Sequence, residues 1–168
     1  MNQNKNIFLT LAIIVVFLGA VIWFSNPTSK PNSLANVESA SNGILTLEET
    51  SFDFGAVSMA KGNVSHNYKV RNDGSEPVTI TKIYTSCMCT TASLIKGGEK
   101  FGPYGMPGHG FFPSLNQRIE PGEEASLEVV FDPAAHGPAG VGRIDRIVNL
   151  ENNAGKPLEL VFSATVTP

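Results

Sequence analysis

Hydrophobic and polar positions divide the chain into three regions. Residues Ile7–Phe24 form an apolar run without a charged side chain, and a helix of this length spans roughly 27 Å, enough to cross a bilayer. The next region, Ser25–Asn42, is rich in Ser, Asn and Pro and has few large apolar side chains, so it is predicted to be a flexible linker. We therefore expect a stub (1–6), a membrane segment (7–24), a linker (25–42) and one folded domain (43–168).

Apolar and polar residues alternate in short segments throughout the predicted domain, which is typical of half-buried strands. Strands are predicted over residues 44–47, 52–57, 64–71, 77–84, 125–131, 142–150 and 158–166. The third of these has one mainly apolar face, which consists of Val64, His66, Tyr68 and Val70. We expect its histidine to pack at the core or edge. About seven strands without a helix-length run between them predict an all-β fold, an immunoglobulin-like antiparallel two-sheet sandwich, with a closed barrel as the alternative.

The charges that flank the apolar run predict its orientation. Lys5 precedes the run and no basic residue follows it before Lys30, which favours a cytoplasmic N-terminus and an extracytoplasmic domain. A cleaved signal peptide is the competing interpretation, but its apolar core is usually about 7 to 15 residues long and is followed by small residues. Because Ser25–Thr28 has no A-x-A pattern, we favour an uncleaved signal anchor. The protein is thus predicted to be a single-pass protein of the cell membrane.

Composition and charge narrow the range of functions. Only 16% of the residues are charged, and 16 glycines and 11 prolines fit a turn-rich β domain. The formal net charge is −3 and the basic residues are scattered along the chain, so nucleic-acid binding is not expected. The sequence contains no G-x-S-x-G, H-E-x-x-H or Walker motif, and we therefore expect a protein that is not an enzyme.

Cys87 and Cys89 are the only cysteines in the chain. In an extended strand their side chains lie on one side, about 6 to 7 Å apart, whereas a disulfide needs Cβ atoms near 3.8 Å. A disulfide between them therefore requires a sharp bend, while a soft metal ion held by two thiolates tolerates the wider spacing. Met88 is expected to face the opposite side. Four interpretations stay open: buried small side chains, a strained redox-active disulfide, a thiolate metal site and intermolecular pairing.

Two loops rich in Gly and Pro add candidate ligands to the cysteine pair. Met106 and His109 lie in the loop 101–110, and His136 lies in the loop 132–140. Thiolate, thioether and imidazole together are the soft ligands that suit Cu(I), whereas the Cys and His spacings typical of zinc sites are absent. The predicted metal ligands are Cys87, Cys89, Met106, His109 and His136. Taken singly, each loop residue is also explained as an ordinary turn residue.

Several motifs together resemble a known bacterial family. In chain order they are FDFGAV, RNDGSEPVTI, TSCMCT, IEPGEEASLEVVFDP and LELVFSATV, and they cover Leu47–Val166. This order resembles the domain-of-unknown-function 1573 family, whose members are similar to immunoglobulin-like domains of the ASPM, SPD-2 and Hydin type. The chain departs from the family pattern at Met88, where Gly is more usual, and in a long insertion over Ala92–Ile119. The resemblance implies an immunoglobulin-like fold and an exported location, and it supplies no activity.

Binding of Cu(I) by the cysteine pair and the two loops is the function we expect from these residues. Two alternatives stay open. In the first, the domain is a non-catalytic module that docks an envelope protein partner, and its cysteines are structural. In the second, the protein carries out thiol-disulfide exchange through Cys87 and Cys89.

Overall fold

The computed structural model describes residues 42–109 and 114–168, and this part of the chain is almost entirely β-structure. Its elements are β1 (Leu45–Leu47), β2 (Ser51–Ser58), the 3-10 turn η1 (Met59–Lys61), β3 (Val64–Asn72), β4 (Val78–Thr85), β5 (Thr90–Lys96), β6 (Glu99–Tyr104), β7 (Gln117–Ile119), β8 (Glu124–Phe131), η2 (Gly137–Gly140), β9 (Gly142–Asn152) and β10 (Leu158–Thr167). None of the helices in the described residues is long and apolar enough to cross a membrane. The segment predicted to do so, residues 7–24, lies outside them, as do the stub and nearly all of the linker.

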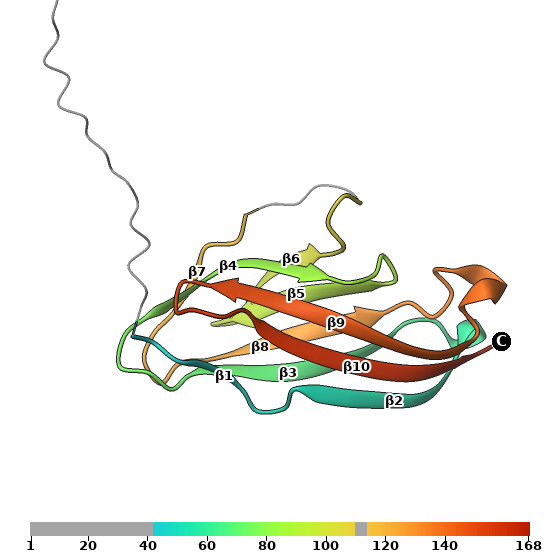
Figure 1. Ribbon diagram of the computed structural model, residues 1–168, viewed down its shortest axis with the longest axis horizontal. Coiled ribbons are helices and arrows are strands. Elements are labelled where there is room, and N and C mark those ends of the chain that lie inside the picture. Colours follow the sequence, from blue (N-terminus) through green and yellow to red (C-terminus); the bar gives the residue numbers. More distant parts are fainter. Residues whose placement is uncertain (1–41, 110–113) are drawn as a thin grey trace, which may run out of the picture. The chain divides into compact units, whose positions relative to one another are not determined.

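The strands form two facing sheets, so the predicted β-sandwich is confirmed (Figure 1). One sheet has the order β1-β3-β8-β5-β6 and the other β2-β10-β9-β4-β7. The prediction that both sheets are antiparallel is wrong at one pair, because β2 runs parallel to β10, with Phe52 opposite Phe162. After β1 the chain passes into the other sheet and continues in the same direction into β2 (Figure 1). Alternation along a strand reports which face is buried and carries no information on the direction of its neighbour.

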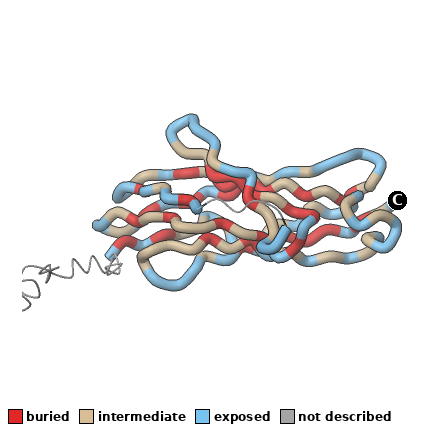
Figure 2. The backbone as a smooth tube through the Cα atoms, turned by 90° about the horizontal axis from the view of Figure 1, so that it is seen from above, coloured by how far each residue is buried: buried red, intermediate tan, exposed pale blue. Residues whose placement is uncertain are grey.

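The core lies between the two sheets and consists of the faces predicted from alternation. In β3, Tyr68 and Val70 are fully buried, and in β10, Leu160 and Phe162 are fully buried. Buried segments accordingly run through the middle of the domain, and exposed segments gather at its loops and turns (Figure 2). At roughly 25 cal/mol per Å² of apolar surface, this burial is the main favourable term in the stability of the sandwich.

The predicted Gly/Pro-rich insertion over Ala92–Ile119 contains strands that were not predicted from the sequence. Most of β5, all of β6 and all of β7 lie within it. A two-residue turn joins β5 to β6, with Lys96 opposite Glu99. Gly97 and Gly98 form this turn with φ values of 58° and 85°. Two successive positive φ angles are what a tight hairpin turn requires, and glycine adopts them without steric cost.

His66 packs at the edge of the core, as predicted. Its ring stacks on Phe52 with 3.6 Å between centroids and meets Tyr68 edge to face at 4.7 Å, and its Nε2 contacts the carboxylate of Glu49. The neighbouring Tyr68 is completely buried. Its hydroxyl has no hydrogen-bond partner among the described residues, which is uncommon for a buried polar group.

Replacing Tyr68 with Phe is expected to raise the free energy of unfolding by about 1 kcal/mol, because it removes a buried hydroxyl without removing a hydrogen bond. Burial, with a further contribution from the charge of Glu49, raises the pKa of Tyr68 above its ordinary value of 10.0. A raised pKa in the folded state means that stability is present below the ordinary value and is lost as the pH rises above it. The gain in Tyr68→Phe should therefore grow in alkaline solution.

Urea denaturation at pH 7 and above pH 10 measures both effects. Tyr84→Phe is the control, because Tyr84 is only partly buried, and it should change the free energy of unfolding less than Tyr68→Phe does. A loss of stability in Tyr68→Phe would show that the hydroxyl makes a favourable contact after all.

Candidate functional site

The two cysteines lie in the turn that carries the chain from β4 in one sheet to β5 in the other. The expected extended strand ends at Thr85, and the N–H of Thr90 donates to Cys87 O at 3.2 Å, which closes a β-turn. The buried hydroxyl of Thr85 lies 2.9 Å from Cys87 O and 3.0 Å from Thr90 O. On the other side of the turn, the N–H of Ser86 donates to Ile147 O at 2.9 Å. The turn is thus fixed by backbone groups on both sides.

This bend brings the two cysteines close enough to form a disulfide. Their Cα atoms are 5.3 Å apart and their sulfur atoms are bonded. Cys89 is only 2% exposed and Cys87 is 9% exposed, whereas Met88 between them points outward and is 53% exposed. The predicted orientation of Met88 is therefore confirmed, and the sharp bend that a disulfide requires is present.

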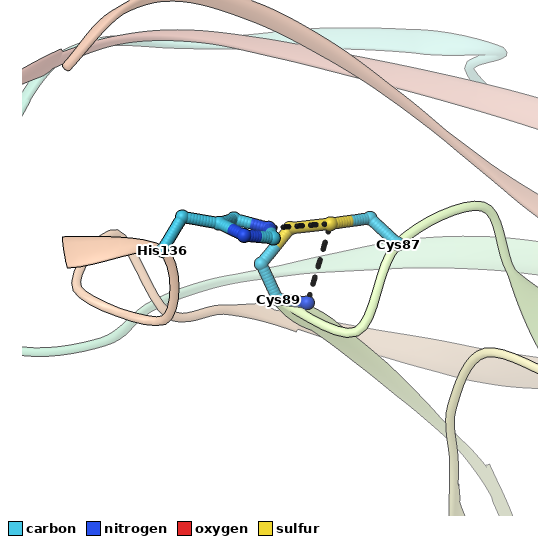
Figure 3. Close-up of side chains that lie close together, drawn as sticks. All are labelled: Cys87, Cys89 and His136. Atoms are coloured by element: carbon cyan, nitrogen blue, oxygen red, sulfur yellow. Dashed lines mark hydrogen bonds between the residues drawn. A yellow bond between two sulfur atoms is a disulfide. The ribbon is translucent and has the colours of Figure 1, made fainter. Parts of the chain in front are cut away.

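His136 reaches the cysteine pair because its loop is tied to the same turn. The N–H of Asp132, the first residue after β8, donates to Cys89 O at 2.9 Å. The carboxylate of Asp132 then accepts from the N–H of Ala134 at 2.8 Å, which turns the loop back on itself. His136 Nε2 consequently lies 3.1 Å from Cys87 Sγ (Figure 3).

Two glycines allow this loop to turn and to pack closely around His136. Gly137 has a φ of 57°, a left-handed conformation that glycine adopts readily. A Cβ atom at Gly140 would lie 3.1 Å from the Cβ of His136, so a larger residue there would press on the histidine. This Gly/Pro-rich loop thus brings the His136 side chain to the cysteines.

Three of the five predicted ligands come together in the structure. The sulfurs of Cys87 and Cys89 and a ring nitrogen of His136 all lie within 4.8 Å of one another. His109 is exposed and is not part of this cluster, and its N–H donates to Met106 O at 3.2 Å in the loop after β6. Within the described part of the chain, neither Met106 nor His109 makes a side-chain hydrogen bond to the sulfurs.

Arg146 also belongs to the site, although it is not among the ligands predicted from the sequence. Its Nε donates to Cys89 Sγ at 3.3 Å, and its Nη1 donates to Asp145 O at 2.8 Å. Pairing of β9 with β10 sets Arg146 opposite Phe162, and alternation along β9 directs its side chain to the inner face with Val148. An arginine on the inward face of a predicted strand was the signal in the sequence.

Hydrogen-bond donors surround both sulfurs. Cys87 Sγ accepts from the N–H of Cys89 at 3.3 Å, and Cys89 Sγ lies 3.5 Å from Thr90 Oγ1 in addition to the Arg146 contact. Donors and a nearby cation favour the thiolate over the thiol when the disulfide is reduced. The arrangement can therefore hold two thiolates and one imidazole, and it can also assist the making and breaking of the disulfide.

Comparisons with known proteins confirm the family resemblance for the first part of the domain. Residues 45–102 match the family described as "Protein of unknown function (DUF1573)". This region includes both cysteines and ends before His136 and Arg146. The sequence matches no curated protein.

Several solved structures are similar to this chain. A protein of unknown function from Porphyromonas gingivalis W83 is 17% identical, with a TM-score of 0.55, 79% of this chain covered and 51% of that protein. A family 123 glycoside hydrolase from Clostridium perfringens is 9% identical, with a TM-score of 0.50. The match covers 74% of this chain and 27% of the hydrolase. The ASH/PapD-like domain of human CEP192 is 12% identical, with a TM-score of 0.46. The match covers 73% of this chain and 84% of that domain. The chain thus spans about half of the first protein, and identities this low support the fold alone.

Replacing Thr85 with Val tests whether this hydroxyl holds the cysteine turn. The substitution keeps the side-chain shape but removes the donor beside Cys87 O and Thr90 O, so the free energy of unfolding should fall by roughly 1 to 3 kcal/mol. Thr79→Val in the same strand is the matched control, because Thr79 is partly exposed and its hydroxyl makes no hydrogen bond within the described residues. Equal effects of the two substitutions in urea denaturation would contradict the assigned role.

Proposed function

We propose that this immunoglobulin-like domain, whose residues 45–102 match the DUF1573 family, binds a soft monovalent metal ion, Cu(I), in its reduced form. The ligands are Cys87, Cys89 and His136. The observation that carries the proposal is the convergence of two sulfurs and one imidazole nitrogen within 4.8 Å, from two loops that are far apart in the sequence. Two thiolates and an imidazole form a donor set that Cu(I) accepts readily.

Burial and exposure at the cluster fit a bound ion. Both cysteine residues are almost completely buried, which limits the access of water and oxidants to them. His136 is exposed, so the cluster has one ligand at the surface through which an ion can enter. Met106 and His109 are not needed for three-coordinate binding, and we leave them out of the proposed site.

Binding requires that the disulfide be opened first. Reduction by an external thiol reductant breaks the sulfur–sulfur bond with two electrons and two protons and gives two thiols. Binding of the ion then releases the two thiol protons, because thiolates are the ligands. We also propose that residues 7–24 anchor the domain outside the cytoplasm, where an unbound thiol pair tends to oxidise.

Thiol-disulfide exchange is the second candidate function, and the donors around the sulfurs favour it. An external thiolate would attack the sulfur of Cys87, the more exposed of the two residues, and Cys89 would leave as a thiolate next to Arg146. The attacking sulfur forms the new bond to Cys87 as the bond between the two cysteines breaks. A second thiolate from the reductant would then release Cys87 and form an external disulfide.

Titration with Cu(I) tests the proposed function. The full-length protein, purified in mild detergent and kept reduced, should bind about one equivalent against a competing Cu(I) chelator. Cys87→Ser and His136→Ala each remove a ligand, so each should lower the affinity by more than the roughly 10- to 100-fold that loss of an outer hydrogen-bond partner costs. The oxidised protein should not bind, because its sulfurs are bonded to each other.

His109→Ala is the matched control, since it removes a histidine from an exposed loop outside the cluster, and it should bind as the wild type does. Folded wild-type protein that binds no Cu(I) contradicts the proposal. In that event, equilibration in a glutathione redox buffer separates the alternatives. A disulfide that opens under mildly reducing conditions favours exchange, and one that resists reduction favours a structural role in an interaction module.

A further inference from the structure

We infer that Arg146 makes the site selective for the charge of the metal ion, so that it binds a monovalent ion in preference to a divalent one. The inference rests on the proposed function and deepens it. Arg146 is the only charged side chain hydrogen-bonded to either sulfur within residues 42–109 and 114–168.

Arg146 differs from the other arginines in its partners. Each of the other three has a carboxylate partner, namely Asp73 for Arg71, Glu120 for Arg118 and Asp53 for Arg143. Arg146 forms no ion pair with a carboxylate in the described part of the chain, and its guanidinium donates to a carbonyl oxygen and to Cys89 Sγ. It is also partly buried, on the inner face of β9. A partly buried cation without a counter-ion is unfavourable, so an anionic partner at the sulfurs would stabilise it.

A count of formal charges identifies the ion that best satisfies this arrangement. Two thiolates and one monovalent ion give a complex with a single negative charge, because a ligating histidine is neutral. The positive charge of Arg146 balances that complex. A divalent ion gives a neutral complex instead and leaves Arg146 uncompensated. In a site this buried, a charge imbalance costs more than it would in water.

Neighbouring acidic residues do not change this balance of formal charges. The carboxylate of Asp132 accepts from the N–H of Ala134 in its own turn and is not among the groups that converge on the sulfurs. Asp145 is exposed, on the outer face of β9, and contacts Arg146 only through its carbonyl oxygen. Arg146 is therefore the side chain available to compensate an anionic complex.

The test compares Cu(I) and Zn(II) affinities of the reduced full-length protein, each measured against a competing chelator. Arg146→Gln keeps a hydrogen-bond donor but removes the charge, and it should lower the ratio of Cu(I) to Zn(II) affinity by about tenfold or more, the range by which outer-sphere partners tune metal sites. Arg146→Lys keeps the charge and should hold the ratio within about threefold of the wild type. Arg143→Gln is the matched control, because Arg143 lies on the exposed face of the same strand, and the ratio should not change.

The possible outcomes separate the two proposals. Wild-type protein without Cu(I) affinity overturns both. Wild-type binding of Cu(I) together with an unchanged ratio in Arg146→Gln overturns the role of Arg146 alone. If Arg146→Gln and Arg146→Lys weaken both metals equally, the arginine acts by holding the structure, and the inference is again wrong. Urea midpoints measured for each variant show whether the domain is still folded.

Discussion

The crossing of the chain from one sheet to the other between Thr85 and Thr90 is the constraint on which the site depends. An antiparallel strand that ends in one sheet and resumes in the facing sheet must turn sharply, and the backbone groups in the turn need partners. Here they find them in Ile147 of β9 and in Asp132 after β8. These two hydrogen bonds fix the cysteines, and they also bring the residues next to Ile147 and Asp132 toward the sulfurs.

The site is therefore assembled from three elements that are distant in sequence. The cysteines come from the crossing itself, His136 from the loop after β8 and Arg146 from β9. The segments that carry His136 and Arg146 are each joined to the cysteine turn by a backbone hydrogen bond, from Asp132 and to Ile147 respectively. Backbone pairing therefore determines where these side chains lie more than contacts among the side chains do. A rigid scaffold that carries its reactive groups at loops and strand ends is a common arrangement in β-sandwich proteins.

The sequence predicted those parts of the structure that depend on local pattern. Alternation identified the buried faces of β3 and β10, and the resemblance of the TSCMCT region to a known family was correct. Local pattern could not identify the parallel pairing of β2, which depends on a partner more than 100 residues away. Local pattern also does not distinguish the Gly97-Gly98 hairpin from the rest of the long insertion, because glycine marks tight turns and loops alike. The loop of His136 starts next to the cysteines because β5 pairs with β8 and sets Thr90 opposite Phe131, and no local motif encodes that pairing.

The short span of the Cys87–Cys89 disulfide has a consequence for the stability of the domain. Cross-links stabilise proteins mainly by restricting the unfolded chain, and the effect grows with the length of the loop that is closed. A sequence separation of 2 closes a very short loop, Cys87 to Cys89, for which the chain-entropy model gives roughly 1.6 kcal/mol, against about 4.7 kcal/mol for a loop of 100 residues. The bond joins neighbours in one turn and does not link the two sheets to each other. By this estimate the bond contributes far less to the fold than a cross-link between the two sheets would, so its reduction should cost the sandwich little stability.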